Sequence, residues 1–377
     1  MAAVLVPAAI ATLVAMIAIW PGSVQHPARS LADQGGVRGE GTVVSVTTRN
    51  CPADTQQSNG WAPRCGSAVV RVTKGPGTGT DTTVDLPQGP SAAQLHVDDD
   101  VVLLYLPNAV PGGQAYTVTD HDRSTPMIWM LALAAAVILA FGRWRGATSL
   151  IGLGVSFAVL LLFVIPAIAN GSAPLLVAVV GAAAIMFAAL YLTHGVDVHT
   201  SVAVAGTLAS LVLTGVLGVG FTAAMHLSGI ASDDDSYLAA TQGNIDMRGL
   251  LLAGIVIGAL GVLDDVTVTQ AVTVAEMAAA GPSTRLQLYR AASRVGRAHV
   301  ASAVNTIVLA YAGASLPLLL VISTGGQPIS DLLTSEFLAQ EILRSAVGTI
   351  GLVASVPITT ALAALVADLR PAPAAPI

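Results

Sequence analysis

The sequence predicts an all-α polytopic membrane bundle of about eight transmembrane helices, with a small external OB-like β-barrel domain between helices one and two. Three observations support this prediction. Apolar runs of membrane-span length recur along the chain, only 10% of its residues are charged, and the mean hydropathy is +0.74. One N-terminal stretch lacks such runs and alternates short β-type segments with turn formers instead.

The first apolar run extends from Ala2 to Trp20. It has neither a basic N-terminal region nor a clean small-x-small cleavage site, both of which a secretory signal peptide normally carries. We therefore expect residues 1–20 to form an uncleaved membrane anchor, with a cleaved signal peptide as the alternative.

Residues 21–124 are rich in Thr, Gly, Pro and Asp and form the expected extracytoplasmic β-rich domain. Turn formers such as Gly75-Pro76-Gly77 separate its β-type runs. Five short strands in about 100 residues are typical of a small sandwich or barrel, and an OB-like barrel is a common five-stranded solution. The expected strands are Gly41–Thr48, Ala68–Thr73, Thr82–Leu86, Val101–Leu106 and Ala115–Thr119.

The two cysteines, Cys51 and Cys65, both lie in this β-rich segment. If the segment is outside the cytoplasm, a single disulfide that closes a short loop is expected, because that environment is oxidising. Two unpaired thiols are the alternative.

After Pro126 one apolar run follows another, and we expect a seven-helix membrane domain over residues 125–370 and a cytoplasmic tail over 371–377. Each run is long enough to cross the hydrocarbon core of a bilayer. The expected spans are 126–142, 148–168, 174–193, 201–226, 248–265, 300–322 and 345–367.

The arginines in short connections predict the orientation in the cell membrane. Arg143 and Arg145 follow the second span, four arginines lie between the sixth and the seventh, and Arg370 follows the last. These places share one side of an eight-span bundle, and arginines in short loops favour the cytoplasmic side. Both termini are then cytoplasmic, and residues 21–124 are external.

The sixth span runs directly into two adjacent carboxylates, Asp264 and Asp265. A charge within a span costs about 2.5–3.5 kcal/mol on insertion scales, so it requires a partner, water or a function. Thr269 follows Asp265 at helical spacing, which indicates that this helix continues with a polar stripe until Gly281-Pro282 ends it.

Further polar residues interrupt the last two spans, where Pro317 and Pro357 also lie. Secondary transporters build their sites from interrupted helices with polar groups near the midplane. Asp265 is the predicted central residue, and Asn305 its partner, because an amide can donate two hydrogen bonds to a carboxylate. The predicted substrate or ion pathway comprises Asp264, Asp265, Thr269, Ser302, Asn305, Thr306 and Thr359.

Three segments in this order resemble the YibE/F family of multi-pass membrane proteins: Gly258-Ala-Leu-Gly-Val-Leu-Asp-Asp-Val266, Gly296-Arg297, and Val304-Asn-Thr-Ile-Val-Leu-Ala-Tyr-Ala-Gly-Ala-Ser-Leu-Pro-Leu-Leu-Leu320. The arrangement of anchor, external β-domain and further spans is also similar. Asp264 stands where the family often has Met, and Ala298-His299 stand where it usually has Asp. The resemblance implies the architecture and leaves the activity open.

Two functions therefore remain open. One is a transporter or permease that handles an unknown solute or ion at an intramembrane site around Asp265 and Asn305. The other is a non-catalytic scaffold or accessory subunit whose external β-domain binds a protein partner. The lipid bilayer is the expected partner in both cases, and no nucleic acid is expected, because the chain has no basic patch of that kind.

An enzyme is not expected. His194 and His199 flank Asp197, but no third strong metal ligand and no nucleophile motif lies nearby in the sequence. A nucleotide-binding loop of the Walker type is also missing from the sequence. We accordingly expect no catalytic residues, no metal and no cofactor.

Overall fold

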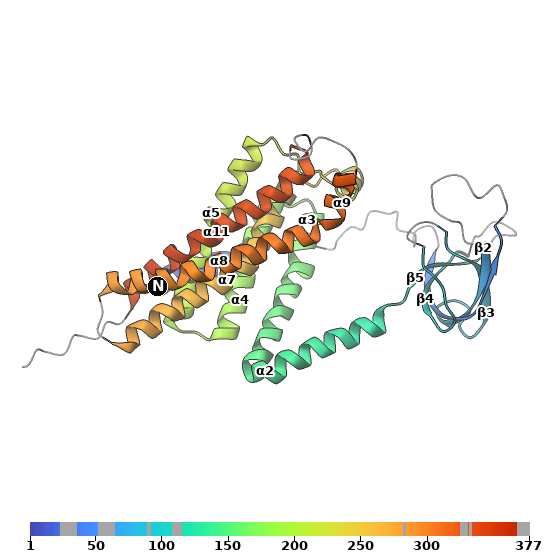
Figure 1. The fold of residues 1–377 in the computed structure, drawn as a ribbon, viewed down its shortest axis with the longest axis horizontal. Helices are drawn as coiled ribbons and strands as arrows, with labels where there is room; N and C mark the ends of the chain where they lie inside the picture. Colours follow the sequence, from blue (N-terminus) through green and yellow to red (C-terminus); the bar gives the residue numbers. More distant parts are fainter. Residues whose placement is uncertain are drawn as a thin grey trace, which may run out of the picture. The chain divides into compact units, whose positions relative to one another are not determined.

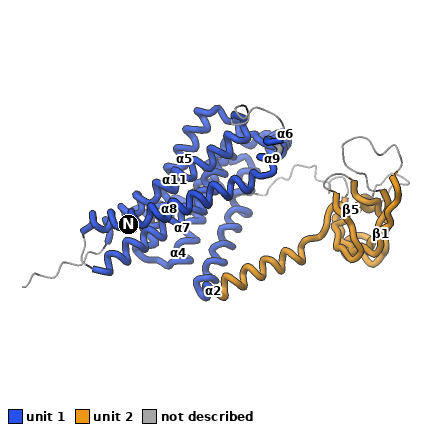
Figure 2. The backbone as a smooth tube through the Cα atoms, in the orientation of Figure 1, with its two compact units in different colours: residues 1–24, 141–377 blue, residues 25–140 orange. Residues whose placement is uncertain are grey.

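The computed structural model of the chain forms two compact units, which are coloured separately in Figure 2. One unit consists of Met1–Val24 and Phe141–Ile377, and the other of Gln25–Ala140. The structure describes the following residues: 1–22, 36–51, 65–88, 92–107, 115–281, 284–324, 331 and 334–367.

The smaller unit holds, within its described residues, a five-stranded antiparallel sheet in the order β3-β2-β1-β4-β5 (Figure 1). The sheet confirms the five strands expected from the sequence, although β1 and β2 are longer than expected. The strands are β1 (Val37–Arg49), β2 (Cys65–Lys74), β3 (Asp81–Asp85), β4 (Asp100–Tyr105) and β5 (Tyr116–His121).

The alternation of apolar and polar residues along these strands places one face of the sheet in a small core. Val43 of β1 lies opposite Val70 of β2, and Leu103 of β4 lies opposite Val118 of β5. All four are at most 4% exposed. Full burial of such side chains contributes about 1.5–3 kcal/mol each relative to exposure, so this unit has a core of its own.

The sheet is open along its described strands. β3 and β5 are its two edges, and no ladder of hydrogen bonds joins them among the described residues. The expectation of a closed OB-like barrel is therefore not confirmed. Both edge strands are short, with five and six residues, which limits how far they can pair with each other.

A disulfide joins Cys51 to Cys65, with their Cα atoms 5.1 Å apart. Cys51 follows the end of β1, and Cys65 is the first residue of β2. The pairing expected from the sequence is confirmed, and the bond ties together the ends of the two strands that form the centre of the sheet.

The larger unit is helical, and α2 leads into it from the smaller one (Figure 1). Single glycines do not interrupt its main helices. α7 ends at Gly281, as the sequence predicts. The helices are α1 (Ala2–Ala18), α2 (Ser124–Val159), the π-helix η2 (Leu160–Val164), α3 (Ile165–Ala169), α4 (Pro174–His194), α5 (Val198–Ala224), α6 (Asp233–Thr241), α7 (Met247–Ala280), α8 (Arg285–Ala314), α9 (Leu316–Thr324) and α11 (Glu336–Val366).

Within the described residues, five helical stretches are long and apolar enough to cross a membrane. The longest contains two of the expected spans, and its backbone leaves the helical region at Arg143, with φ 50° and ψ −126°. α1 has only 17 residues and is not among the five, so the expected count of eight spans is not confirmed. The five are Ser124–Ala169, Pro174–His194, Val198–Ala224, Met247–Ala280 and Glu336–Val366.

The expected span 300–322 is divided between two helices. α8 begins at a capping box formed by Thr284 and Gln287 and runs without a break to Ala314. α9 starts at Leu316, directly before Pro317. Proline has no backbone N–H to continue a helix and disfavours helical geometry in the preceding residue, which explains why the apolar run breaks there.

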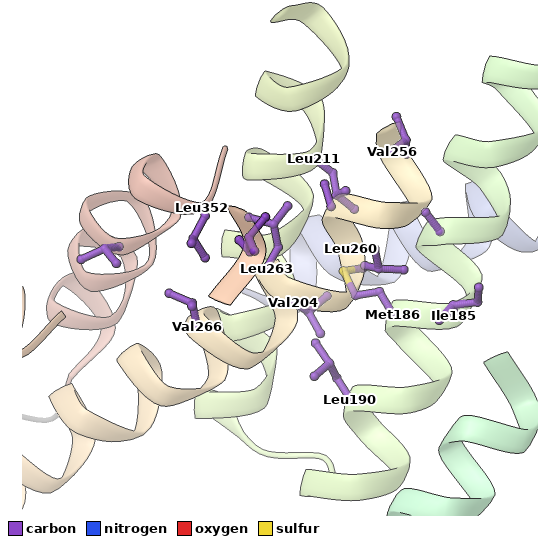
Figure 3. Close-up of a cluster of buried hydrophobic side chains, with 14 of the residues drawn as sticks. Ile185, Met186, Leu190, Val204, Leu211, Val256, Leu260, Leu263, Val266 and Leu352 are labelled. Carbon is purple, nitrogen blue, oxygen red and sulfur yellow. The ribbon is translucent and has the colours of Figure 1, made fainter. Parts of the chain in front are cut away.

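α7 is the central helix of the larger unit and packs against α4, α5, α8 and α11. Figure 3 shows side chains of α4, α5, α7 and α11 meeting in the main apolar cluster, which includes Met186, Val204, Leu263 and Leu352. Because α7 is surrounded in this way, its polar residues face several different neighbours, and these contacts define the candidate site.

Candidate functional site

α7 carries both carboxylates about halfway along its length. At 1.5 Å per residue its 34 residues extend over about 51 Å, which exceeds the roughly 30 Å of a hydrocarbon core. The two acids have different surroundings. Asp264 is half-buried and its Oδ1 accepts a hydrogen bond of 2.9 Å from the backbone N–H of Asp265, whereas the side chain of Asp265 is 74% exposed. Adjacent helical residues point about 100° apart, which explains the difference.

The charged partner of Asp265 comes from α8. Nε2 of His299 lies 3.9 Å from Oδ2 of Asp265. This nitrogen is buried, and it has no hydrogen-bond partner among the described residues. The two side chains therefore form a loose pair across the α7–α8 contact, at a distance longer than a direct hydrogen bond.

Asn305, the expected partner, does not reach Asp265. Asn305 is exposed on α8, and no hydrogen bond joins the two side chains in the described part of the chain. It lies six residues after His299, which places it about 9 Å further along the helix and about 120° around it. Ser302 and Thr306 are exposed as well, and the Thr306 hydroxyl donates to the Ser302 carbonyl at 3.2 Å.

A second group of polar side chains lies inside the bundle, and we call it the buried polar layer. Two hydrogen bonds cross between helices in this layer. The hydroxyls of Thr207 and Thr267 are 2.7 Å apart, and the Thr360 hydroxyl donates to Oε1 of Gln270 at 3.0 Å. Its members are all 0% exposed: Thr207 of α5, Thr267 and Gln270 of α7, and Thr359 and Thr360 of α11.

Two atoms of the buried polar layer have no hydrogen-bond partner within the described residues, Nε2 of Gln270 and Oγ1 of Thr359. An unsatisfied buried polar group costs about 1–3 kcal/mol. Such groups in a native structure call for an explanation, and one explanation is a bound ligand or water. Gly296 of α8 allows the close approach to Gln270, because an added Cβ would lie 2.8 Å from both terminal atoms of that amide.

Thr359 also belongs to a repeated contact between α5 and α11, the glycine–threonine seam. Both helices carry Gly, Ser and Thr at intervals of four: Gly206, Ser210 and Thr214 on α5, and Gly351, Ser355 and Thr359 on α11. A Cβ added at Gly206 would collide with Oγ1 of Thr359, and one added at Gly351 would collide with Oγ1 of Thr214. The helices are thus antiparallel and related by a local two-fold arrangement.

The residues selected from the sequence belong mostly to one part of the candidate site, and most of the buried polar layer was not selected. Of the predicted pathway residues, only Thr359 is in the buried polar layer; the others lie on α7 and α8. Thr267 and Gln270 were missed, although Thr267 follows Asp264 by three residues and Gln270 follows Thr267 by three, steps that turn away from Asp265. Thr207 and Thr360 gave no signal beyond a hydroxyl within an apolar run, because packing alone decides which of many threonines is buried.

The polar segment between α4 and α5 has a structural role. The side chain of Asp197 accepts a hydrogen bond of 2.7 Å from the N–H of Thr200 and so caps α5. Nδ1 of His194 lies 2.7 Å from the hydroxyl of Thr193. Across the described residues, no group of three or more His, Cys, Asp or Glu side chains is placed to hold a metal ion.

Comparison with known proteins identifies one family. A family model described as YibE/F-like protein matches residues 130–369, which include the whole of α4 to α11 and both parts of the candidate site. No curated protein and no solved structure matches the chain. The β-sheet lies outside the matched region.

Proposed function

The chain belongs to the YibE/F-like family, and on this premise we propose that it is a transporter- or permease-like membrane protein that moves a small polar solute or an ion. The observation that supports this proposal most is the set of polar side chains on α7. This apolar helix of span length holds a carboxylate 3.9 Å from an imidazole and, further along, the fully buried Gln270 with an unpaired amide nitrogen. Ionisable groups at membrane depth are costly and typically mark pathways for solutes, ions or protons.

The buried polar layer supports a site for a neutral or weakly charged group. It offers hydroxyls and an amide, which both donate and accept hydrogen bonds. Among the described residues that are buried, the polar side chains are all Ser, Thr or Gln. Pro357 lies within α11 next to this layer and removes one backbone hydrogen bond there, a feature of interrupted helices in transporters.

The test is solute flux in proteoliposomes containing the purified full-length chain, with a panel of small polar solutes and inorganic ions. Asp265→Asn is expected to lower flux at least about tenfold, whereas Asp264→Met is milder, because the family resemblance implies that Met is tolerated there. Glu276→Gln is the matched control, since it removes an exposed acid from the same helix. Wild-type flux in Asp265→Asn would contradict the proposal.

We further propose the cell membrane as the location, with both termini in the cytoplasm and residues 21–124 outside. The arginines in short connections support this orientation. This orientation requires eight membrane passes. α1, each half of α2 and the α8–α9 segment would each supply one of them. The strand order places β3 and β5 at the two edges of the sheet, and these two strands also contact each other, which supports an OB-like barrel opened between them. No catalytic step is part of this proposal.

A scaffold function is the second candidate. The observation that favours it is the independent core and disulfide of the β-unit, which suit a folded module outside the membrane that binds a protein. The two candidates differ in what restores the phenotype of a gene deletion. A scaffold acting through its β-domain predicts rescue by residues 1–124 alone, whereas a transporter requires α7, α8 and α11.

A further inference from the structure

We propose that Asp265 and His299 together form a proton-binding site, so that the proton is the ion to which transport is coupled. This inference rests on the proposed transport function and names its coupling ion. The site combines a carboxylate on α7 with an imidazole on α8, two helices that pack against each other.

The first argument is the unfilled hydrogen-bonding position of His299. Its Nε2 is buried and has no hydrogen-bond partner among the described residues, and it is 3.9 Å from the carboxylate oxygen. A neutral imidazole carries its hydrogen on one nitrogen, and the other only accepts; with the hydrogen on Nδ1, the two facing atoms, Nε2 of His299 and Oδ2 of Asp265, are both acceptors and do not attract each other. A proton on Nε2 turns it into a charged donor directed at the carboxylate, and a small movement of either side chain closes the contact.

The second argument is the lack of a permanent cation beside Asp265. No Arg or Lys forms an ion pair with it among the described residues, where its single charged partner is His299. A carboxylate at membrane depth therefore depends on a titratable group for neutralisation. Histidine is the side chain whose ordinary charge change falls between pH 5 and 8, which makes His299 the proton carrier that we propose for this pair.

The charged groups of the surrounding helices are few. α7 itself adds Asp264, which is bonded to the Asp265 backbone, and the more distant Glu276. α8 adds exposed arginines that precede His299, and α9 carries no charged residue. α11 packs against Gly296 of α8 through Val356, far from its own charged residues. The remaining Asp, Glu, His and Arg side chains of these helices are Arg248 of α7, Arg285, Arg290, Arg294 and Arg297 of α8, Glu336, Glu341 and Arg344 near the start of α11, His194 of α4 and His199 of α5.

The binding step is a simple acid–base reaction. A proton from water adds to the lone pair of Nε2 of His299, and the imidazolium formed donates its N–H to Oδ2 of Asp265. Release returns the proton to water and restores the neutral imidazole and the free carboxylate. On binding, an O–H bond of hydronium breaks, the N–H bond forms and water is left; release reverses both changes, and the step needs no further reactant.

The first experiment is a double-mutant cycle of thermal stability in detergent, at pH 5.5 and pH 8.5, with the full-length chain. The ion pair exists only when His299 is protonated, so its stabilising effect is present at low pH and lost as pH rises. His299→Gln is expected to lower the Tm by about 2 °C more at pH 5.5 than at pH 8.5. This extra loss should vanish in the Asp265→Asn background, and His199→Gln, an exposed histidine of α5, should not produce it.

The second experiment separates the coupling ion from the transport function. Proteoliposomes that contain a pH-sensitive dye are expected to show proton flux with wild type and a loss of at least about tenfold with His299→Gln. Solute flux that is indifferent to pH and to His299→Gln would overturn the proton inference and leave transport standing. If the double-mutant cycle shows the pH-dependent coupling but the protein carries no flux, the proton site stands and the transport function is overturned. A Tm effect of His299→Gln that is equal at both pH values, or unchanged by Asp265→Asn, would overturn the site itself.

Discussion

At the scale of single residues, Glu336 fixes the loop between α5 and α6 to the start of α11. Its Oε1 accepts hydrogen bonds from the N–H and the hydroxyl of Ser228, both at 2.6 Å, from the N–H of Gly229 at 3.0 Å, and from Nε2 of Gln340 at 3.1 Å. Nε of Arg248 holds the same loop from α7, through the Leu227 carbonyl at 2.9 Å. Glu336 thus joins the loop to α11, and Arg248 joins the same loop to α7.

Glu336→Ala is expected to destabilise the protein, because it leaves four donors without their shared acceptor. Loss of a charged acceptor costs about 1–3 kcal/mol, which corresponds to a fall in Tm of several degrees for a unit of this size. Thermal unfolding in detergent measures the effect. Glu341→Ala is the control, since its ion pair with Arg344 is 3.9 Å long. An equal or larger loss in the control would contradict the assigned role of Glu336.

At the scale of elements, the glycine–threonine seam determines how closely α5 and α11 approach. Lipid tails are as apolar as leucine, so helices in a bilayer are held together by close packing of small residues rather than by hydrophobic burial. Here each helix supplies a glycine that receives a threonine of the other, and Ser210 and Ser355 lie between these contacts, both fully buried. The seam therefore fixes the register of the two helices that enclose the buried polar layer.

Gly206→Ala is expected to lower stability by about 1–3 kcal/mol, the typical cost of overpacking, because its methyl group would collide with Oγ1 of Thr359. Gly215→Ala on the same helix is the matched control, since no atom lies within 4 Å of a Cβ placed there. Thr359→Ala should restore part of the loss when combined with Gly206→Ala. Equal unfolding temperatures for the two glycine variants would contradict the assigned packing.

At the scale of the whole molecule, the sequence and the family resemblance predict on which side of the membrane each part of the chain lies. Thr80 lies in the exposed turn before β3, and Arg290 is exposed on α8. Neither residue belongs to the candidate site, so a cysteine at either position reports accessibility alone.

In a background without Cys51 and Cys65, a membrane-impermeant maleimide is expected to label Thr80→Cys in intact cells. Arg290→Cys should become labelled only after the membrane is permeabilised, because the arginine-rich connections favour the cytoplasmic side. Mass-tag electrophoresis measures both reactions. Labelling of Arg290→Cys in intact cells would reverse the proposed orientation.

The sequence by itself determined the features that depend on neighbours along the chain. Short β-type runs between turn formers located all five strands, apolar runs located α4, α5, α7 and α11, and Gly281 marked the end of α7. The two cysteines had no competitor for pairing, and they are bonded. Local backbone preference and side-chain periodicity suffice for such predictions.

Only the tertiary structure decided the features that depend on how elements rotate and slide against one another. It paired Asp265 with His299 instead of Asn305, buried Gln270 rather than the neighbouring acids, left the β-sheet open, and matched Gly206 with Thr359. The physical reason is that the sequence shows a polar residue within an apolar helix but does not show which neighbour its face of the helix will meet. Which face meets a neighbour is set by helix packing, where contacts between small residues select one register among many that are similarly apolar.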